Sequence, residues 1–230
     1  MQPLFGGPAY FIRNLVYHAP EGGAVKFTAS SSGIVVYHNT FVASITPMLL
    51  AVSNVHYRNN LILGTNNGAE VFSIESNTNY TSSDYNGFRP NPAADLTFGW
   101  STPPFEIIAQ FPGEAGTLAT RPQAQFEAQF REARHFSDLP AYAEATRQDQ
   151  NSVLIDYDDF ISVMPPSGDP RTLYSPASFN FGLAPDSMAI DAGLYLPGIN
   201  DGFSGEAPDV GALERGEPQP HYGPRQGRQR

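Results

Sequence analysis

The sequence contains no cysteine, one lysine (Lys26) and one tryptophan (Trp100), and charged residues make up only 16% of its 230 residues. Without cysteine the chain cannot be a small domain held together by disulfides. The formal net charge of −10 argues against nucleic acid as a partner, because nucleic-acid binders present basic surfaces to phosphates. No apolar run approaches the ~18 residues that a membrane-spanning helix requires, so we expect no membrane contact either.

Glycine and proline are abundant instead, with 21 residues of each. This content disfavours a helix bundle or a coiled coil, because both residues break helices. Hydrophobic residues reach 40% and aromatic residues 12%, which is too apolar for a disordered chain. A turn-rich, mainly β chain remains, and its length allows a large buried core.

Four short segments in the first part of the chain repeat one pattern, a β-rich stretch that ends at a polar residue. Asn14, Asn39, Asn59 and Asp84 align as the anchors of this repeat, at spacings of 25, 20 and 25 residues. A strand, a turn and a regular return are typical of one coil of a β-solenoid. Asparagine tolerates the left-handed backbone of a corner, and stacked amides can hydrogen-bond from coil to coil. We favour such a ladder over the alternative that the asparagines mark unrelated turns.

Strand alternation then assigns each side chain near the anchors to the core or to the surface. The residues predicted to point inward are Ile12, Val35, Tyr37, Val55 and Tyr57. The residues predicted to point outward are Phe11, Arg13, Val36, His38, His56 and Arg58. The outward set places Arg13, His38 and Arg58 in one column, which predicts an exposed basic groove. The alternative interpretation of this column is a solvated or locally salt-bridged surface.

Residues 6–17 and 34–42 resemble coils of the right-handed parallel β-helix proteins in the pectate-lyase-like superfamily. Residues 187–193 and 207–214 are similar to the terminal sequence of many bacterial β-helix proteins, with Met188 in place of a usual proline. The resemblance implies a mainly β fold, a right-handed parallel β-helix (solenoid) with a C-terminal cap that contains one or two short α-helices. Such a cap would cover the open sheet edge of the last coil.

Composition and resemblance together divide the chain into four parts. These are β-helix coils over 1–88, a proline- and aromatic-rich covering loop over 89–122, a helical and β cap region that completes the solenoid over 123–216, and a flexible tail over 217–230. Within the cap region we expect helices over 123–135 and 139–147, the second capped by Ser137 or Asp138, and a strand over 153–157.

Acidic residues in the cap region are interpreted as structural. Asp191 and Asp209 suit tight turns. Asp156, Asp158 and Asp159 are expected to form a solvated loop rather than a metal site. No metal ligands and no cofactor are assigned, and Ca²⁺ is left open although the sequence has no Asp-x-Asp-x-Asp-Gly loop.

The resemblance implies a carbohydrate-active protein, part of a secreted polysaccharide lyase or glycoside hydrolase. It implies an extracellular or periplasmic monomer whose partner is a polysaccharide. A lyase must neutralise a uronate carboxylate and abstract a proton, and basic side chains serve both needs. We therefore assign Lys26, His38 and Arg58 as catalytic residues. The substrate-binding residues are Arg13, His56 and Trp100, with Trp100 as a sugar-stacking surface unless it belongs to the core.

Two other functions stay open at this point. The chain could be a non-catalytic carbohydrate-binding or cell-surface module, or the C-terminal fragment of an enzyme whose catalytic coils lie upstream. The fragment is favoured by an N-terminus that begins inside a β pattern and lacks the features of a signal peptide. No Gly-x-Ser-x-Gly motif is present, and nothing in the spacing suggests a Ser-His-Asp site.

Overall fold

The computed structural model describes residues 8–19, 23–25, 32–43, 45, 52–65, 68–76, 80–102 and 132–218. Strands in parallel sheets dominate this part of the chain, and helical segments are few. The prediction of a mainly β fold is therefore confirmed. Among the described residues, no helix has the length and the apolar character needed to cross a membrane.

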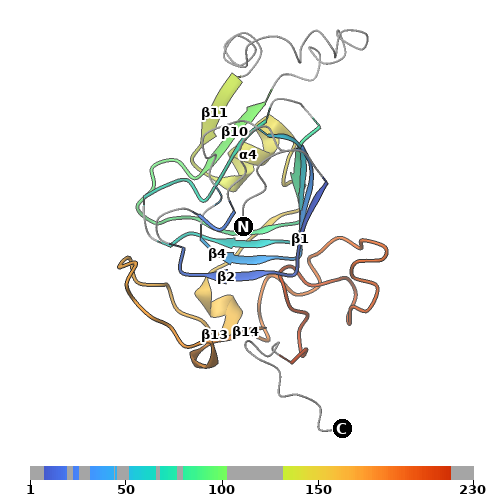
Figure 1. Cartoon of the computed structure of the whole chain (residues 1–230). Coiled ribbons are helices and arrows are strands. Elements are labelled where there is room, and N and C mark those ends of the chain that lie inside the picture. The colour runs from blue at the N-terminus through green and yellow to red at the C-terminus, as the bar shows by residue number, and fades with distance from the viewer. Residues whose placement is uncertain are drawn as a thin grey trace.

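Two parallel sheets form the centre of the molecule (Figure 1). The first sheet contains, in spatial order, β1 (Ala9–Ile12), β3 (Ser32–Tyr37), β5 (Ser53–Arg58) and β8 (Ser82–Asp84). The second sheet contains, in spatial order, β12 (Val153–Leu154), β9 (Gly87–Arg89), β6 (Leu61–Leu63), β4 (Thr40–Val42) and β2 (Leu15–Tyr17). Two residues connect each strand of the first sheet to a strand of the second, so the chain turns the same corner four times.

The third sheet consists of β7 (Phe72–Glu75), β10 (Phe98–Thr102) and β11 (Glu132–Phe136), with β10 parallel to β7 and antiparallel to β11. Two expectations are wrong here. Residues 98–102 form a buried strand rather than part of an irregular covering loop, and residues 132–135 form a strand rather than the end of a helix. Pairing with a strand distant in sequence overrides the local pattern in both cases. The rest of that expected helix, 123–131, lies outside the described residues.

The helix expected over 139–147 is confirmed as α4 (Leu139–Thr146). The Asp138 carboxylate accepts a hydrogen bond from the backbone N–H of Ala141 at 2.8 Å, and Pro140 occupies the first turn. Arg147 ends the helix in the left-handed conformation, with φ 57°. Start and stop signals of this kind are local, which is why the sequence predicts them.

The C-terminal region continues from β12 with short elements. The 3-10 helix η1 (Tyr157–Asp159) leads into β13 (Phe160–Ser162), and η2 (Pro176–Ser178) precedes β14 (Asn180–Leu183), which pairs antiparallel with β13. The strand expected over 153–157 is thus shorter than predicted, because the capping box of η1 interrupts it.

A ladder of buried asparagines runs along the corner between the first two sheets. Side-chain amides donate to the next side-chain oxygen from Asn14 to Asn39 at 2.9 Å, from Asn39 to Asn60 at 2.8 Å and from Asn60 to Asn86 at 2.9 Å. Each of these oxygens also accepts the backbone N–H of the preceding rung. The predicted ladder is therefore confirmed, and it satisfies polar groups that are withdrawn from water.

The membership of the ladder differs from the prediction at its last two rungs. The residue before each rung adopts a left-handed backbone, with φ 53° at Arg13, 51° at His38, 56° at Asn59 and 56° at Tyr85. Asn59 therefore occupies the same corner position as Arg13 and His38, one residue before its rung. Asp84 lies two residues before its rung, at the end of β8. The expected register was wrong because two asparagines stand side by side at 59–60 and only the second is a rung.

The left-handed corner residues also determine which side chains face the core. Val55 and Tyr57 are completely buried, as predicted. Phe11 and Val36, which were expected outside, are buried in register with Tyr57, so that assignment was wrong for β1 and β3. In β1 and β3 the left-handed residues Arg13 and His38 interrupt the alternation just before the rung, so side chains counted back from Asn14 and Asn39 lie on the face opposite to the expected one.

Two hydrophobic cores determine which sheet faces are covered. The first core lies between the inner faces of the three sheets and includes Phe41, Ile62 and Phe88 of the second sheet. The neighbouring residues Val42 and Leu63 point to the opposite face and belong to the second core, beneath the C-terminal region. The second sheet is therefore buried on both faces. The outward residues of the first sheet belong to neither core.

Candidate functional site

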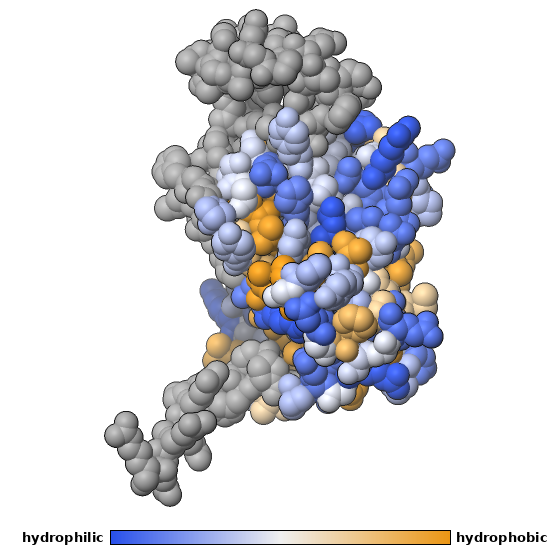
Figure 2. All heavy atoms as spheres, turned by 90° about the vertical axis from the view of Figure 1, so that its right-hand side faces the viewer, coloured by the Kyte–Doolittle hydropathy of each residue, from blue (hydrophilic) through white to orange (hydrophobic). Residues whose placement is uncertain are grey.

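The outward side chains of the first sheet form two rows across the strands. One row contains Tyr10, Val35, His56 and Ser82, and the other contains Ile12, Tyr37, Arg58 and Asp84. We call these two rows, together with Asn54 on β5, the outer face. Figure 2 views the molecule from the side on which β1 lies in Figure 1, where hydrophilic residues predominate between smaller apolar patches. The fold thus leaves one sheet face with polar and aromatic groups accessible.

Hydrogen bonds connect the polar side chains at the centre of the outer face. His56 Nδ1 lies 2.8 Å from Ser82 Oγ, and His56 Nε2 lies 3.0 Å from Asn54 Oδ1. Arg58 donates from Nη2 to Ser82 Oγ at 2.8 Å and from Nη1 to the carbonyl of Tyr57 at 2.7 Å. Strand geometry brings them together, because Asn54, His56 and Arg58 alternate along β5 and Ser82 is the register partner of His56.

Arg58 is the cation of this cluster, and the shifted pKa values of its neighbours His56 and Tyr37 favour their neutral forms. Burial, followed by the nearby Arg58 charge, lowers the pKa of His56 below its usual value. Burial raises the pKa of Tyr37, and the Arg58 guanidinium offsets part of that effect. Within the described part of the chain, no carboxylate lies within 4.0 Å of Arg58. The guanidinium can therefore bind a carboxylate or carbonyl oxygen of a ligand.

The other sequence-predicted site residues lie elsewhere or outside the described residues. Lys26 falls outside them. Trp100 lies in β10 with only 3% of its surface exposed, its Nε1 donating to Thr102 Oγ1 at 3.1 Å. Its ring packs edge-on against Tyr142 in the first core. The sugar-stacking surface expected at Trp100 is wrong, because a ring enclosed in the core cannot lie against a sugar.

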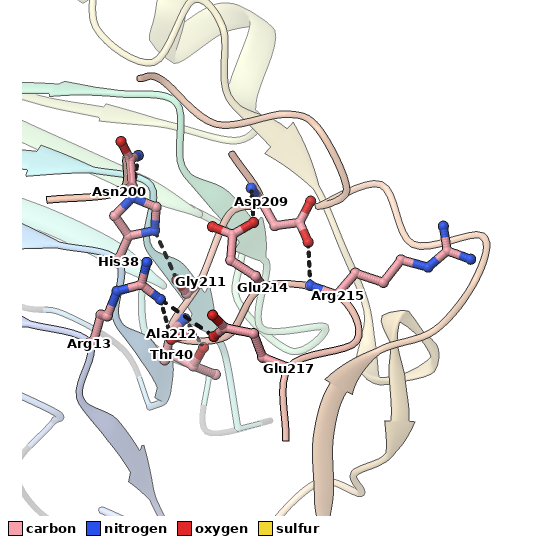
Figure 3. A network of polar contacts seen from close by, with 10 residues as sticks. All are labelled: Arg13, His38, Thr40, Asn200, Asp209, Gly211, Ala212, Glu214, Arg215 and Glu217. Carbon is pink, nitrogen blue, oxygen red and sulfur yellow. Dashed lines mark hydrogen bonds and ion pairs between the residues drawn. The ribbon is translucent and has the colours of Figure 1, made fainter. Parts of the chain in front are cut away.

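His38 is completely buried at the corner, under residues 184–218, which follow β14 and which we call the C-terminal segment (Figure 3). The side-chain amides of Asn59 and Asn200 donate to His38 Nε2 at 2.9 and 2.8 Å, so Nδ1 carries the proton and donates to the Gly211 carbonyl at 3.1 Å. Burial, with a smaller effect of the Arg13 charge, lowers the pKa of His38 to about 4. The histidine therefore anchors the C-terminal segment in its neutral form.

Arg13 also contacts the C-terminal segment rather than a groove. Its Nη1 donates to the Ala212 carbonyl at 3.3 Å and lies 4.0 Å from the Glu217 carboxylate (Figure 3). The predicted exposed groove of Arg13, His38 and Arg58 is wrong, because the first two are corner residues and Arg58 belongs to the strand before the corner. His56 and Arg58 are the two predicted residues that the structure brings together on the outer face.

The acidic residues of the C-terminal segment hold backbone groups. The Asp191 carboxylate accepts from the backbone N–H of Glu206 at 2.8 Å, and Asp209 accepts from those of Asp191 at 2.8 Å and Arg215 at 2.6 Å. This agrees with their predicted role in turns. In the described ranges, no three histidine or acidic side chains gather as a metal site would require.

Sequence reasoning missed Ser82, Asn54, Tyr37 and Tyr10 as members of one surface. Alternation within β5 is visible in the sequence, but the neighbours of β5 follow only from the correct register. The asparagine rungs at 14, 39, 60 and 86 carry that register, and aligning them places Ser82 beside His56.

The fold and the site together define a mainly β protein with stacked parallel strands and one polar, accessible sheet face. A scan against models of known protein families found no match. Searches of curated proteins and of solved structures found no match either.

Proposed function

We propose that the chain is a right-handed parallel β-helix protein of the pectate-lyase-like kind, and that it binds a polysaccharide on the outer face. The recurring corner supports the fold, with amide rungs 25, 21 and 26 residues apart. Stacked strands of this kind produce a flat surface that lengthens with each pass of the chain. A long polymer can lie across such a surface.

The composition of the outer face is the observation that carries the function. Tyr10 is 68% exposed, and Tyr37 lies on the next strand, so aromatic rings are available to stack on sugar rings. Arg58 is fixed by Ser82 and by a backbone carbonyl, and its planar guanidinium suits a uronate carboxylate. We therefore favour an acidic polysaccharide as the ligand, encountered outside the cytoplasm as the family resemblance implies.

Lyase or glycoside hydrolase chemistry is the second candidate, and binding is favoured over it for one reason. Both nitrogens of His56 are held in hydrogen bonds to Ser82 and Asn54, and the raised pKa of Tyr37 keeps its phenol protonated at neutral pH. Neither group is thus ready to abstract a sugar C–H proton. Release of unsaturated uronate from polygalacturonate, followed by absorbance, would support the lyase.

A binding measurement tests the proposal. We expect the full chain to be retarded by polygalacturonate in affinity electrophoresis, and Arg58→Gln to weaken this retardation about tenfold or more, because a charge-assisted contact is lost. Arg171→Gln is the matched control, since Arg171 is exposed in the C-terminal region. Failure to bind any acidic or neutral polysaccharide, or equal loss in both variants, would overturn the proposal.

A further inference from the structure

The outer face contains a hydrogen-bonded chain of three side chains that sugar binding does not require. Ser82 Oγ contacts His56 Nδ1 at 2.8 Å, and His56 Nε2 contacts Asn54 Oδ1 at 3.0 Å. Serine, imidazole and an orienting oxygen in this order are the parts of a nucleophilic catalytic triad. We propose that Ser82 is a nucleophile that cleaves small carboxylic esters, with His56 as its general base and Asn54 as a positioning residue.

The direction of each hydrogen bond follows from the chemistry of the partners. Asn54 Oδ1 only accepts, so the proton of the neutral imidazole resides on His56 Nε2 and is donated to Asn54. Nδ1 then carries a lone pair and accepts the Ser82 hydroxyl proton. The lowered pKa of His56 keeps this lone pair available at neutral pH. Asn54 thus selects the tautomer that can receive the serine proton.

Arg58 gives the nucleophile an electrostatic partner. Its Nη2 donates to Ser82 Oγ at 2.8 Å, the same oxygen that contacts His56 Nδ1. A guanidinium at this distance stabilises negative charge on the serine oxygen and on the oxygen of an adjacent tetrahedral intermediate. Three of the four groups come from alternate positions of β5, so one rigid strand positions them.

Asn54 shows that the arrangement is specified locally. Its φ of 54° is left-handed inside a strand, a conformation that costs energy in most residues and that asparagine tolerates. This backbone conformation places the amide beside the imidazole two residues later.

The reaction balances with water as the only co-substrate. Ser82 Oγ attacks the ester carbonyl carbon while its proton moves to His56 Nδ1. The bond from that carbon to the alcohol oxygen breaks, and His56 returns the proton to this oxygen, which leaves an acyl-Ser82 ester and a free alcohol. Water then attacks the acyl carbon and gives a proton to His56, which passes it to Ser82 Oγ as the carboxylic acid leaves.

The position of Ser82 indicates the substrate class. Ser82 and His56 are partly exposed on the face of a sheet, so an ester displayed on a larger molecule can reach them. We therefore assign carboxylic esters carried on a larger molecule as the substrate class, and an acetyl ester is the smallest probe of it. This inference does not depend on polysaccharide recognition, because the acyl transfer requires only the ester.

Active-site labelling tests the nucleophile directly. We expect a fluorophosphonate probe to modify the full chain at Ser82, as located by peptide mass spectrometry, and p-nitrophenyl acetate to be hydrolysed. Ser82→Ala should abolish both signals, and His56→Gln should slow hydrolysis about a hundredfold or more. Ser178→Ala, at an exposed serine in η2, should change neither. Thermal unfolding of each variant separates loss of chemistry from loss of fold.

The positioning role of Asn54 has its own readout. Asn54→Asp should retain labelling at Ser82, because a carboxylate also accepts from His56 Nε2, whereas Asn54→Ala should slow hydrolysis and shift its pH profile. Absence of labelling at Ser82, or hydrolysis by Ser82→Ala equal to that of the unmodified chain, would overturn the inference. Labelling of Ser82 without retardation by any polysaccharide would support the inference and contradict only the proposed function.

Discussion

At the scale of single residues, the asparagine side chains of the corner depend on one another for their hydrogen bonds. Asn39, Asn60 and Asn86 are completely buried, and each side-chain oxygen accepts two N–H groups from the preceding rung. Removing one rung therefore leaves buried N–H donors without their acceptor, and neither water nor another side chain takes its place.

Asn60→Ala should lower the free energy of unfolding by about 2–4 kcal/mol. The substitution removes the oxygen that accepts from Nδ2 and the backbone N–H of Asn39, and it removes the donor to Asn86. Urea unfolding followed by circular dichroism measures the change. Asn151→Ala, which breaks an exposed contact with Asp84, is the control and should cost less than about 1 kcal/mol. Equal losses would show that the ladder contributes no more than a surface contact.

At the scale of elements, the contact between the C-terminal segment and the corner involves two groups, Glu214 and His38, whose pKa values shift in opposite directions on folding. Burial, aided by the neighbouring Asp209 charge, raises the pKa of Glu214 from 4.5 to about 7. The folded state thus holds this proton more tightly than the unfolded state, and the stability it contributes is lost as pH rises through 7. The pKa of His38 falls from 6.5 to about 4, so its contribution is lost as pH falls below 6.5.

The two effects should nearly cancel between pH 4.5 and 6.5, and single substitutions should separate them. Relative to the unmodified chain, Glu214→Gln should lose about 1 kcal/mol of unfolding free energy per pH unit as pH falls through this window. His38→Asn, which places at this corner the residue that the next pass carries at position 59, should gain a similar amount. Urea unfolding at several pH values measures both slopes, and the double variant should restore the unmodified profile. Parallel profiles for all four proteins would contradict the argument.

Elements defined by local signals were the ones that the sequence predicted correctly. Helix α4 follows from Asp138 and Pro140, and the corner ladder follows from the recurring asparagine, although its last two rungs lie one and two residues beyond the predicted Asn59 and Asp84. β11 was mistaken for a helix because only its pairing with β10 makes it a strand. The same reason explains why the sequence predicts two residues of the candidate site but not their contact with Ser82. Alternation places His56 and Arg58 outside, but the contact with Ser82 requires the register between β5 and β8.

At the scale of the whole molecule, the two central sheets differ in what covers their outward faces. The C-terminal region packs on the second sheet and forms a core there, whereas the outer face of the first sheet belongs to neither core. A binding or catalytic surface has to be uncovered, as the outer face of the first sheet is. A sheet face that only supports the fold can be covered, as that of the second sheet is. Equivalent residues on the two faces should therefore respond differently to the same substitution.

Val42 and Val35 provide a matched pair for this comparison. Both point outward, Val42 from β4 and Val35 from β3, but Val42 is completely buried in the second core and Val35 is partly exposed. Threonine has nearly the same shape as valine and adds one hydroxyl, which costs about 1–3 kcal/mol where it finds no partner. Val42→Thr should thus lower the free energy of unfolding by this amount, and Val35→Thr by less than about 0.5 kcal/mol, because water can reach its hydroxyl. Urea unfolding of both variants measures the difference. A cost at Val35 equal to that at Val42 would mean that the first sheet is covered as well, and the polysaccharide and the ester would then have no access to Arg58 and Ser82.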